Sequence, residues 1–131
     1  MNPLTKIVTR FGYIEIFTNE DQSTVYAIPN GYVGPKLVKK DLKFLEEFDR
    51  GSKAKWTYIV DISNVKIIHP LNPFLLKGLQ QFSKMKEYIV YAPSPIVRFL
   101  LTLTNWINKP DRIIKNRKEL LVELRQTKII N

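Results

Sequence analysis

Alternating and β-branched apolar residues fill the first part of the chain and predict strands. The segments 6–11 and 13–17 are rich in isoleucine, valine and aromatic residues, with Gly12 between them. A third short strand is predicted over 24–28, and Pro29-Asn30-Gly31 after it is typical of a turn. We expect these opening strands to form antiparallel edges of a sheet.

The hydrophobic spacing then becomes helical and predicts a helix over 35–50. Pro35 suits the first helical turn, because an N–H at that position would have no partner within the helix. Gly51 is a natural residue to follow a helix end. The apolar face of this helix is made of Leu37, Val38, Leu42, Leu45 and Phe48.

Strands and helices alternate through the rest of the chain. Continuous apolar runs predict strands over 56–62 and 88–91 that are covered on both faces, and a short strand is predicted over 112–115. Between and after them, helices are predicted over 73–84, over 95–107 and from Asn116 onward.

Each of these helices begins with a recognisable cap. Asn72-Pro73 and Ser94-Pro95 place a capping side chain before a proline, and Asn116 with Glu119 is similar to a capping box. The resulting order is β-β-β-α-β-α-β-α-β-α. It predicts a single α/β domain over residues 1–131, with a central mixed sheet and about four α-helices.

The segment Tyr58–Val65 and this order of elements resemble the STAS superfamily, which includes sulfate-transporter tail domains and bacterial anti-sigma-factor antagonists. Its central strand reads as an aliphatic run, Asp, an aliphatic residue and Ser, followed by an Asp-Ser-(Ser/Thr)-Gly loop that opens a helix. Asp61-Ile62-Ser63 matches the first part. The later segment Asn105–Pro110, with Arg112–Ile114 after it, is similar to a subgroup of uncharacterised bacterial STAS-like proteins.

The resemblance implies a non-catalytic, regulatory domain that acts through protein–protein contact. In the antagonists, a partner kinase phosphorylates a hydroxyl of the loop. By position, that loop falls here on His69, Pro70, Leu71 and Asn72, and residues 67–74 contain neither Ser nor Thr. We therefore expect the phosphorylation switch to be lost, and these four residues are candidates for a partner- or ligand-binding loop.

Ser94 joins this candidate loop because it follows the next predicted parallel strand. The carboxyl ends of parallel strands meet at one edge of a sheet, where α/β proteins commonly bind ligands. Residues 69–72 and 93–95 would then form the rim of one site. The explanation that we favour for His69 is an ordinary loop histidine, and for Asn72 and Ser94 it is a helix cap.

The helix predicted over 95–107 is apolar nearly all round, which is typical of a helix covered on more than one side. Phe99, Leu103 and Trp106 are its candidate interface or pocket-wall residues. Three explanations stay open. The helix packs between the sheet and the last helix, it binds a protein partner or a second copy of the chain, or it walls a pocket for a lipid-like ligand.

The charge of the chain is positive and unevenly distributed. Residues 1–65 hold nine basic and eight acidic side chains, whereas residues 66–131 hold twelve and four, for a net charge of +9. A Lys-rich solvated face explains this excess, and so would an anionic surface as partner. Nucleic-acid binding is not favoured, since no helix-turn-helix or RNA-recognition signature accompanies the basic residues.

Catalysis finds little support. The chain has no cysteine and one histidine, which removes thiolate chemistry and most serine–histidine machinery, and it carries no P-loop or Gly-x-Ser-x-Gly motif. No metal or cofactor is predicted. The apolar stretch 89–107 is interrupted by Pro93, Pro95 and Arg98 and is not expected to span a membrane. We expect a cytoplasmic domain that binds a protein partner or itself as a homodimer; the alternative is a carrier or sensor of a small apolar or amphipathic ligand.

Overall fold

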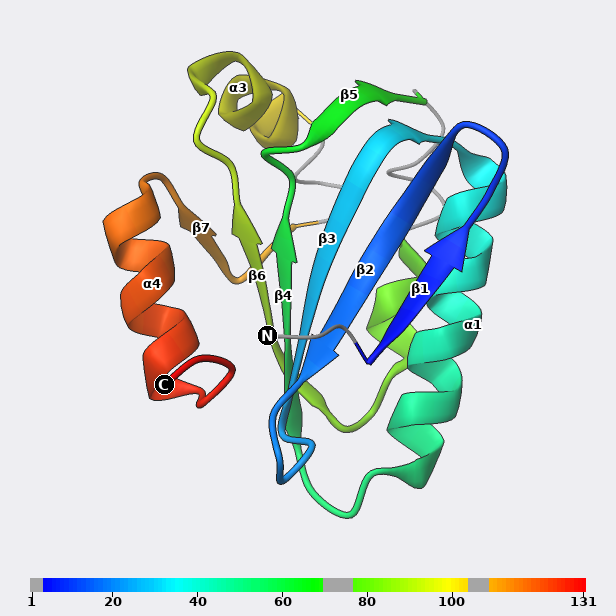
Figure 1. Cartoon of the computed structure of the whole chain (residues 1–131), viewed down its shortest axis with the longest axis vertical. Helices are drawn as coiled ribbons and strands as arrows, with labels where there is room; N and C mark the ends of the chain where they lie inside the picture. The colour runs from blue at the N-terminus through cyan, green and yellow to red at the C-terminus, as the bar shows by residue number, and fades with distance from the viewer. Residues whose placement is uncertain (1–3, 70–76, 104–108) are drawn as a thin grey trace.

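A computed structural model describes residues 4–69, 77–103 and 109–131, with the backbone alone at position 68 and over 100–103. Within these residues the centre is a seven-stranded sheet in the order β1-β2-β3-β4-β6-β7, with β5 paired to β3 beside this path (Figure 1). The strands are β1 (Thr5–Val8), β2 (Gly12–Thr18), β3 (Thr24–Val33), β4 (Trp56–Asp61), β5 (Val65–Ile68), β6 (Met85–Tyr91) and β7 (Arg112–Ile114). The helices are α1 (Pro35–Gly51), the 3₁₀-helix η1 (Lys77–Gln81), α3 (Pro95–Leu103) and α4 (Arg117–Gln126).

The sheet is mixed, as the sequence predicts. β1, β2 and β3 pair antiparallel at one side, and β3, β4, β6 and β7 run parallel across the rest. Each parallel step is bridged by a segment that returns the chain to the start of the next strand, as in other α/β proteins. The carboxyl ends of β4, β6 and β7 therefore lie at one edge.

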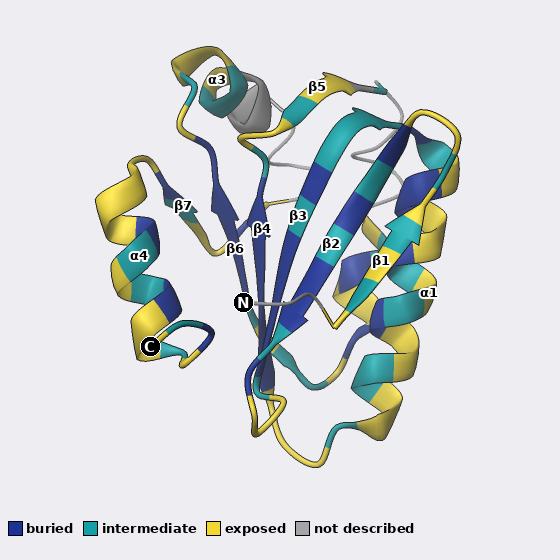
Figure 2. Ribbon diagram, in the orientation of Figure 1, coloured by how far each residue is buried: buried dark blue, intermediate teal, exposed yellow. Residues whose placement is uncertain are grey.

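Helices cover both faces of the parallel strands. Figure 1 shows α1 and η1 on one face and α4 on the other. All six residues of β4 are buried, which confirms the prediction that this strand is covered on both sides, and Figure 2 shows the buried strands at the centre of the domain. The absence of polar alternation in β4 follows from this position.

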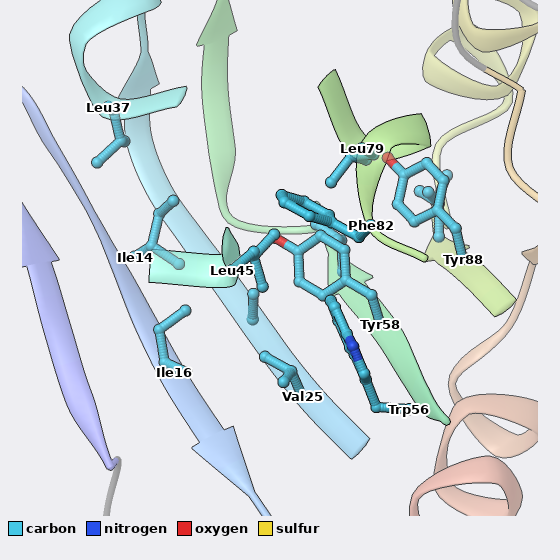
Figure 3. Close-up of a cluster of buried hydrophobic side chains, with 14 residues drawn as sticks. Ile14, Ile16, Val25, Leu37, Leu45, Trp56, Tyr58, Leu79, Phe82 and Tyr88 are labelled. Carbon is cyan, nitrogen blue, oxygen red and sulfur yellow. The ribbon is translucent and has the colours of Figure 1, made fainter. Parts of the chain in front are cut away.

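The larger core lies between the sheet and α1. Leu37 and Leu45 of α1 pack against β2 and β4, and Leu79 and Phe82 close the core around η1. Figure 3 shows this cluster, in which the rings of Trp56, Tyr58 and Tyr88 line the β4–β6 side. The opposite core joins the other face of the sheet to α4 and the C-terminal segment, through Phe17, Tyr26, Ile59, Ile89, Tyr91, Ile114, Leu120, Leu124 and Ile129.

The turn predicted at Pro29-Asn30-Gly31 is wrong, because these residues lie inside β3. Gly31 has a φ of +80°, which glycine adopts without strain, so the strand shifts its register there and continues. β2 pairs with residues 29–31 of this extension, and β5 pairs with residues 31–33. The four residues of β5 were not predicted as a strand, since so short a run carries little periodicity.

The α-helix predicted over 73–84 is not found in its described part, residues 77–84. Residues 77–81 form the single 3₁₀ segment η1, and β6 begins at Met85 where the prediction placed the helix end. Residues 73–76 lie outside the described part of the chain. In that part there are three α-helices, and the sheet has one strand more than predicted.

Candidate functional site

The carboxyl end of the parallel strands is held as one rigid edge. The N–H of Ile62 donates to the carbonyl of Tyr91 at 3.1 Å, and the N–H of Ala92 donates to the carbonyl of Ile114 at 3.0 Å. These bonds continue the strand ladder past the ends of β4 and β6. The loops that leave this edge therefore start from fixed positions, which is the usual setting for a binding site in an α/β sheet.

His69 lies at this end of the molecule, directly after β5. Its backbone N–H donates to the carbonyl of Val33, the last residue of β3, at 3.1 Å, and the residue is half-buried. The loop therefore leaves the sheet from an anchored position. Pro70, Leu71 and Asn72, the other candidate loop residues, lie outside the described residues and stay predictions.

Ser94 marks the start of α3, as expected for a cap residue. Its Oγ accepts from the N–H of Val97 at 3.5 Å, a long contact, and its carbonyl accepts from the N–H of Arg98 at 3.0 Å. The guanidinium of Arg98 donates to the carbonyls of Ala92 and Pro93, both at 2.9 Å. The connection between β6 and α3 is thus fixed by its own hydrogen bonds.

The helix α3 exposes large apolar side chains. Ile96 is 73 % exposed and Phe99 is 63 % exposed, whereas Val97 packs against the core beneath α1. Among the described side chains of α3, residues 95–99, none belongs to the core that α4 covers on the opposite face. The side chain of Leu103 and all of Trp106 lie outside what the structure describes.

A third apolar side chain is exposed at the same end of the sheet. Ile67 of β5 is 61 % exposed, and Figure 1 shows β5 and α3 together at the carboxyl end. We call Ile67, Ile96 and Phe99 the apolar rim. Single exposed apolar residues are common on protein surfaces, and these three make the carboxyl end of the sheet a candidate for a binding surface.

A buried carboxylate lies beneath this edge. Oδ1 of Asp61 accepts from the N–H and the hydroxyl of Ser63, at 2.9 and 2.6 Å, and Oδ2 accepts from the hydroxyl of Tyr26 at 3.1 Å. Burial, together with the charge and hydrogen bond of Asp61, raises the pKa of Tyr26, so this phenol remains a donor. Both carboxylate oxygens of Asp61 therefore have hydrogen-bond donors, and the residue fixes the end of β4 to β3 and to the turn at Ser63.

The sequence analysis did not predict this cluster. The strand alternation of β3 puts Tyr26 on the face shared with Ile59 and Asp61, but the pairing of β3 with β4 is needed to bring the groups together. The one local signal of this cluster in the sequence is Asp61 itself, an aspartate at the end of a buried strand.

A polar groove of about 490 Å³ opens beside Ser63. It lies where β2 and β3 meet the β4–β5 connection and is lined by Tyr13, Asn30, Gly31, Ser63, Asn64, Val65 and Lys66. The sequence analysis missed it because a turn was expected at Gly31 and no strand at Val65. The groove continues the candidate edge toward the antiparallel strands.

The edge near α4 is positively charged. Lys115, Arg117 and Lys118 are exposed directly after β7. The four acidic side chains of residues 66–131 are engaged elsewhere: Glu87 and Glu123 pair with Arg112, Asp111 accepts from the N–H of Tyr88, and Glu119 accepts from the amide of Asn116. Lys115, Arg117 and Lys118 therefore present positive charge to solvent beside the start of α4.

Comparison with known proteins identifies the fold. No known family profile matches the sequence, and no curated protein matches it. The structure is similar to that of the anti-sigma factor antagonist SpoIIAA in its unphosphorylated form, with a TM-score of 0.63 and 16 % identity over 90 % of this chain and 99 % of that one. The chain has a SpoIIAA-like fold.

A second solved structure agrees. An uncharacterised protein of the DUF3478 family from Shewanella loihica PV-4, described as having a SpoIIAA-like fold, has a TM-score of 0.60 and 16 % identity over 95 % of this chain and 98 % of that one. The fold implied by the resemblance of the Asp61-Ile62-Ser63 segment to the STAS superfamily is thus confirmed. Among the described residues, no helix has the length and apolar character needed to cross a membrane.

Proposed function

We propose that this chain is a non-catalytic, cytoplasmic regulatory domain that binds a protein partner through the carboxyl end of its sheet. The observation that carries the proposal is the exposure of Ile96 and Phe99 on a helix whose start is anchored by Ser94 and Arg98. A rigidly presented apolar side chain loses little conformational freedom on binding, so its burial favours association. The SpoIIAA-like fold supports a regulatory role.

The binding is proposed to work without phosphorylation. Residues 67–74, where the antagonists carry the phosphorylated hydroxyl, contain no Ser or Thr. Complementarity to the apolar rim and to the basic residues after β7 would then decide the partner. Removing one large apolar side chain from water contributes roughly 1.5–3 kcal/mol, so Ile96 and Phe99 together would supply a substantial part of a micromolar affinity.

The test is affinity capture with the wild-type chain and two matched variants. The double variant Ile96→Ser/Phe99→Ser alters the rim, and Val122→Ser alters an exposed apolar residue of α4 on the other face. We expect a partner to be retained by the wild type and by Val122→Ser, and its affinity, measured with the purified partner, to fall at least tenfold for the double variant. Equal affinity for all three would contradict the proposal, provided that the melting temperatures agree.

The protein partner could also be a second copy of this chain, which would form a homodimer. Light scattering at two concentrations measures the solution mass. A dimer of the wild type that becomes monomeric in the rim variant would place the homodimer interface on α3. A dimer that persists in the rim variant would place it elsewhere.

The alternative is a carrier or sensor of a small apolar or amphipathic ligand, and the apolar composition of α3 favours it as the second candidate. Native mass spectrometry of the purified chain distinguishes the two. A bound small molecule that is lost in the rim variant, with no protein partner captured, would support the carrier and contradict partner binding.

A further inference from the structure

Asp41 is a carboxyl group enclosed in the interior. It lies on the face of α1 that packs against the sheet and is 4 % exposed. Its Oδ2 accepts from the hydroxyl of Tyr58 on β4 at 2.6 Å, and its Oδ1 has no hydrogen-bond partner among the described residues. Figure 3 shows the hydroxyl end of Tyr58 directed from β4 toward α1. The group thus joins the helix to the sheet through its hydrogen bond with Tyr58.

Among the described residues, no positively charged side chain is paired with Asp41. The titratable group in contact with it is the phenol of Tyr58 on β4, whose ring stacks on that of Tyr88 on β6 with centroids 5.8 Å apart. The core cluster that contains Tyr58 is otherwise apolar, with Leu45 from α1 itself and Leu79 and Phe82 from η1 and the residues after it. None of the ion pairs of the described residues involves Asp41. Within the part of the chain that the structure describes, a charge at this position is therefore neither paired nor fully hydrogen-bonded.

A buried carboxyl in such a place favours its neutral form. Burial raises the pKa of Asp41 from 3.8 to about 6, and the hydrogen bond from Tyr58 opposes this only in part. Burial also raises the pKa of Tyr58, so the phenol stays protonated and continues to donate. The Asp41–Tyr58 bond is thus kept across the range in which Asp41 changes charge, and what ionisation adds is a buried negative charge on a carboxylate whose Oδ1 has no partner among the described residues.

We propose that Asp41 is a pH-sensitive latch that seats α1 firmly on the sheet when it is neutral and loosens the helix when it is ionised. The latch acts next to the candidate site, because α1 begins two residues after Val33, whose carbonyl holds the N–H of His69. This proposal does not depend on the proposed partner. It concerns the packing of α1 alone.

The sign of the effect follows from linkage. In the folded protein the pKa of Asp41 lies above its unfolded value, so folding retains a proton that the unfolded chain releases. The contribution of Asp41 to stability is complete below about pH 4, is lost as the pH rises to about 6, and is constant above that. Acidification within this range therefore tightens α1.

The first test uses the unaltered protein. The ¹³Cγ resonance of Asp41, assigned by its absence from Asp41→Asn, is followed by NMR from pH 3 to 8. We expect a midpoint near 6, and after correction for the intrinsic exchange rate, faster hydrogen exchange of the α1 amides at pH 7.5 than at pH 5. A midpoint near 4, or equal protection of α1 at both pH values, would overturn the proposal.

The second test compares matched variants by thermal unfolding. Asp41→Asn carries no titrating group, and Glu47→Gln removes a carboxylate that is exposed on the same helix. Relative to the wild type, Asp41→Asn is expected to gain melting temperature as the pH rises from 5 to 7.5, whereas Glu47→Gln keeps the wild-type slope. Tyr58→Phe removes the opposing hydrogen bond and should move the Asp41 midpoint to higher pH. Parallel curves for the wild type and Asp41→Asn would refute the latch, and if Asp41→Asn does not fold, the wild-type titration decides.

Discussion

The hydroxyl of Tyr26 on β3 donates to the carboxylate of Asp61 on β4, joining two residues that are 35 positions apart. Asp61→Ala would leave this buried phenol without its acceptor, and it would remove the acceptor of the N–H and hydroxyl of Ser63. An unsatisfied buried polar group costs about 1–3 kcal/mol. We expect the free energy of unfolding to fall by about 2–3 kcal/mol. Urea denaturation measures it, with Ser63→Ala as a control that keeps the Tyr26 bond, removes only the Ser63 hydroxyl bond and should lose only about 1 kcal/mol. An equal loss in both variants would show that the Tyr26 bond contributes nothing.

Asp49 near the end of α1 ties the helix to the start of two strands. Its Oδ1 accepts from Nε1 of Trp56 at 2.7 Å and from the N–H of Lys84 at 3.1 Å. Asp49→Ala leaves the indole N–H of a fully buried tryptophan unpaired, so we expect a loss of about 1–3 kcal/mol in stability. A shift in the fluorescence maximum of Trp56 should accompany it. Glu46→Ala, which removes only an exposed pair with Arg50, should change stability by less than about 0.5 kcal/mol.

Gly12 permits the close approach of the β1–β2 turn to the end of β3. A Cβ at this position would overlap the carbonyl oxygen of Tyr32 and meet that of Asn30 at 3.0 Å, and both are backbone atoms that cannot easily move. Gly12→Ala should therefore lower the melting temperature by several degrees. Gly51→Ala is the matched control, since nothing lies within 4 Å of its Cβ. A melting temperature unchanged by Gly12→Ala would mean that the strand ends separate at little cost.

Asn116 caps α4. Its side-chain oxygen accepts from the N–H of Glu119 at 2.9 Å, and its amide donates to the Glu119 carboxylate at 3.2 Å. Asn116→Ala should cost about 1 kcal/mol, whereas Asn116→Ser should retain most of the stability. Denaturant unfolding followed by circular dichroism checks both. If serine proves as costly as alanine, the contact between the two side chains outweighs the backbone cap.

Local signals in the sequence predicted several elements closely. The helix predicted over 35–50 is α1 over Pro35–Gly51, and the cap predicted at Asn116 precedes α4. The burial of β4 on both faces followed from its continuous apolar run. The resemblance carried by Asp61-Ile62-Ser63 correctly implied the fold. In the candidate site, Ser94 stands at the start of α3, as its cap pattern predicted, whereas His69 follows β5, a strand that was not predicted.

The sequence by itself determined where helices begin, which segments are buried and the class of the fold, because caps and periodicity act over a few neighbouring residues. The tertiary structure alone decided the pairing of β5 with the end of β3, the contact of Tyr26 with Asp61 and the hydrogen bond of Asp41 with Tyr58. It also decided that Ile96 and Phe99 face solvent while α4 covers the opposite face. These features depend on contacts between distant segments, and no local pattern specifies which distant strand or helix completes them.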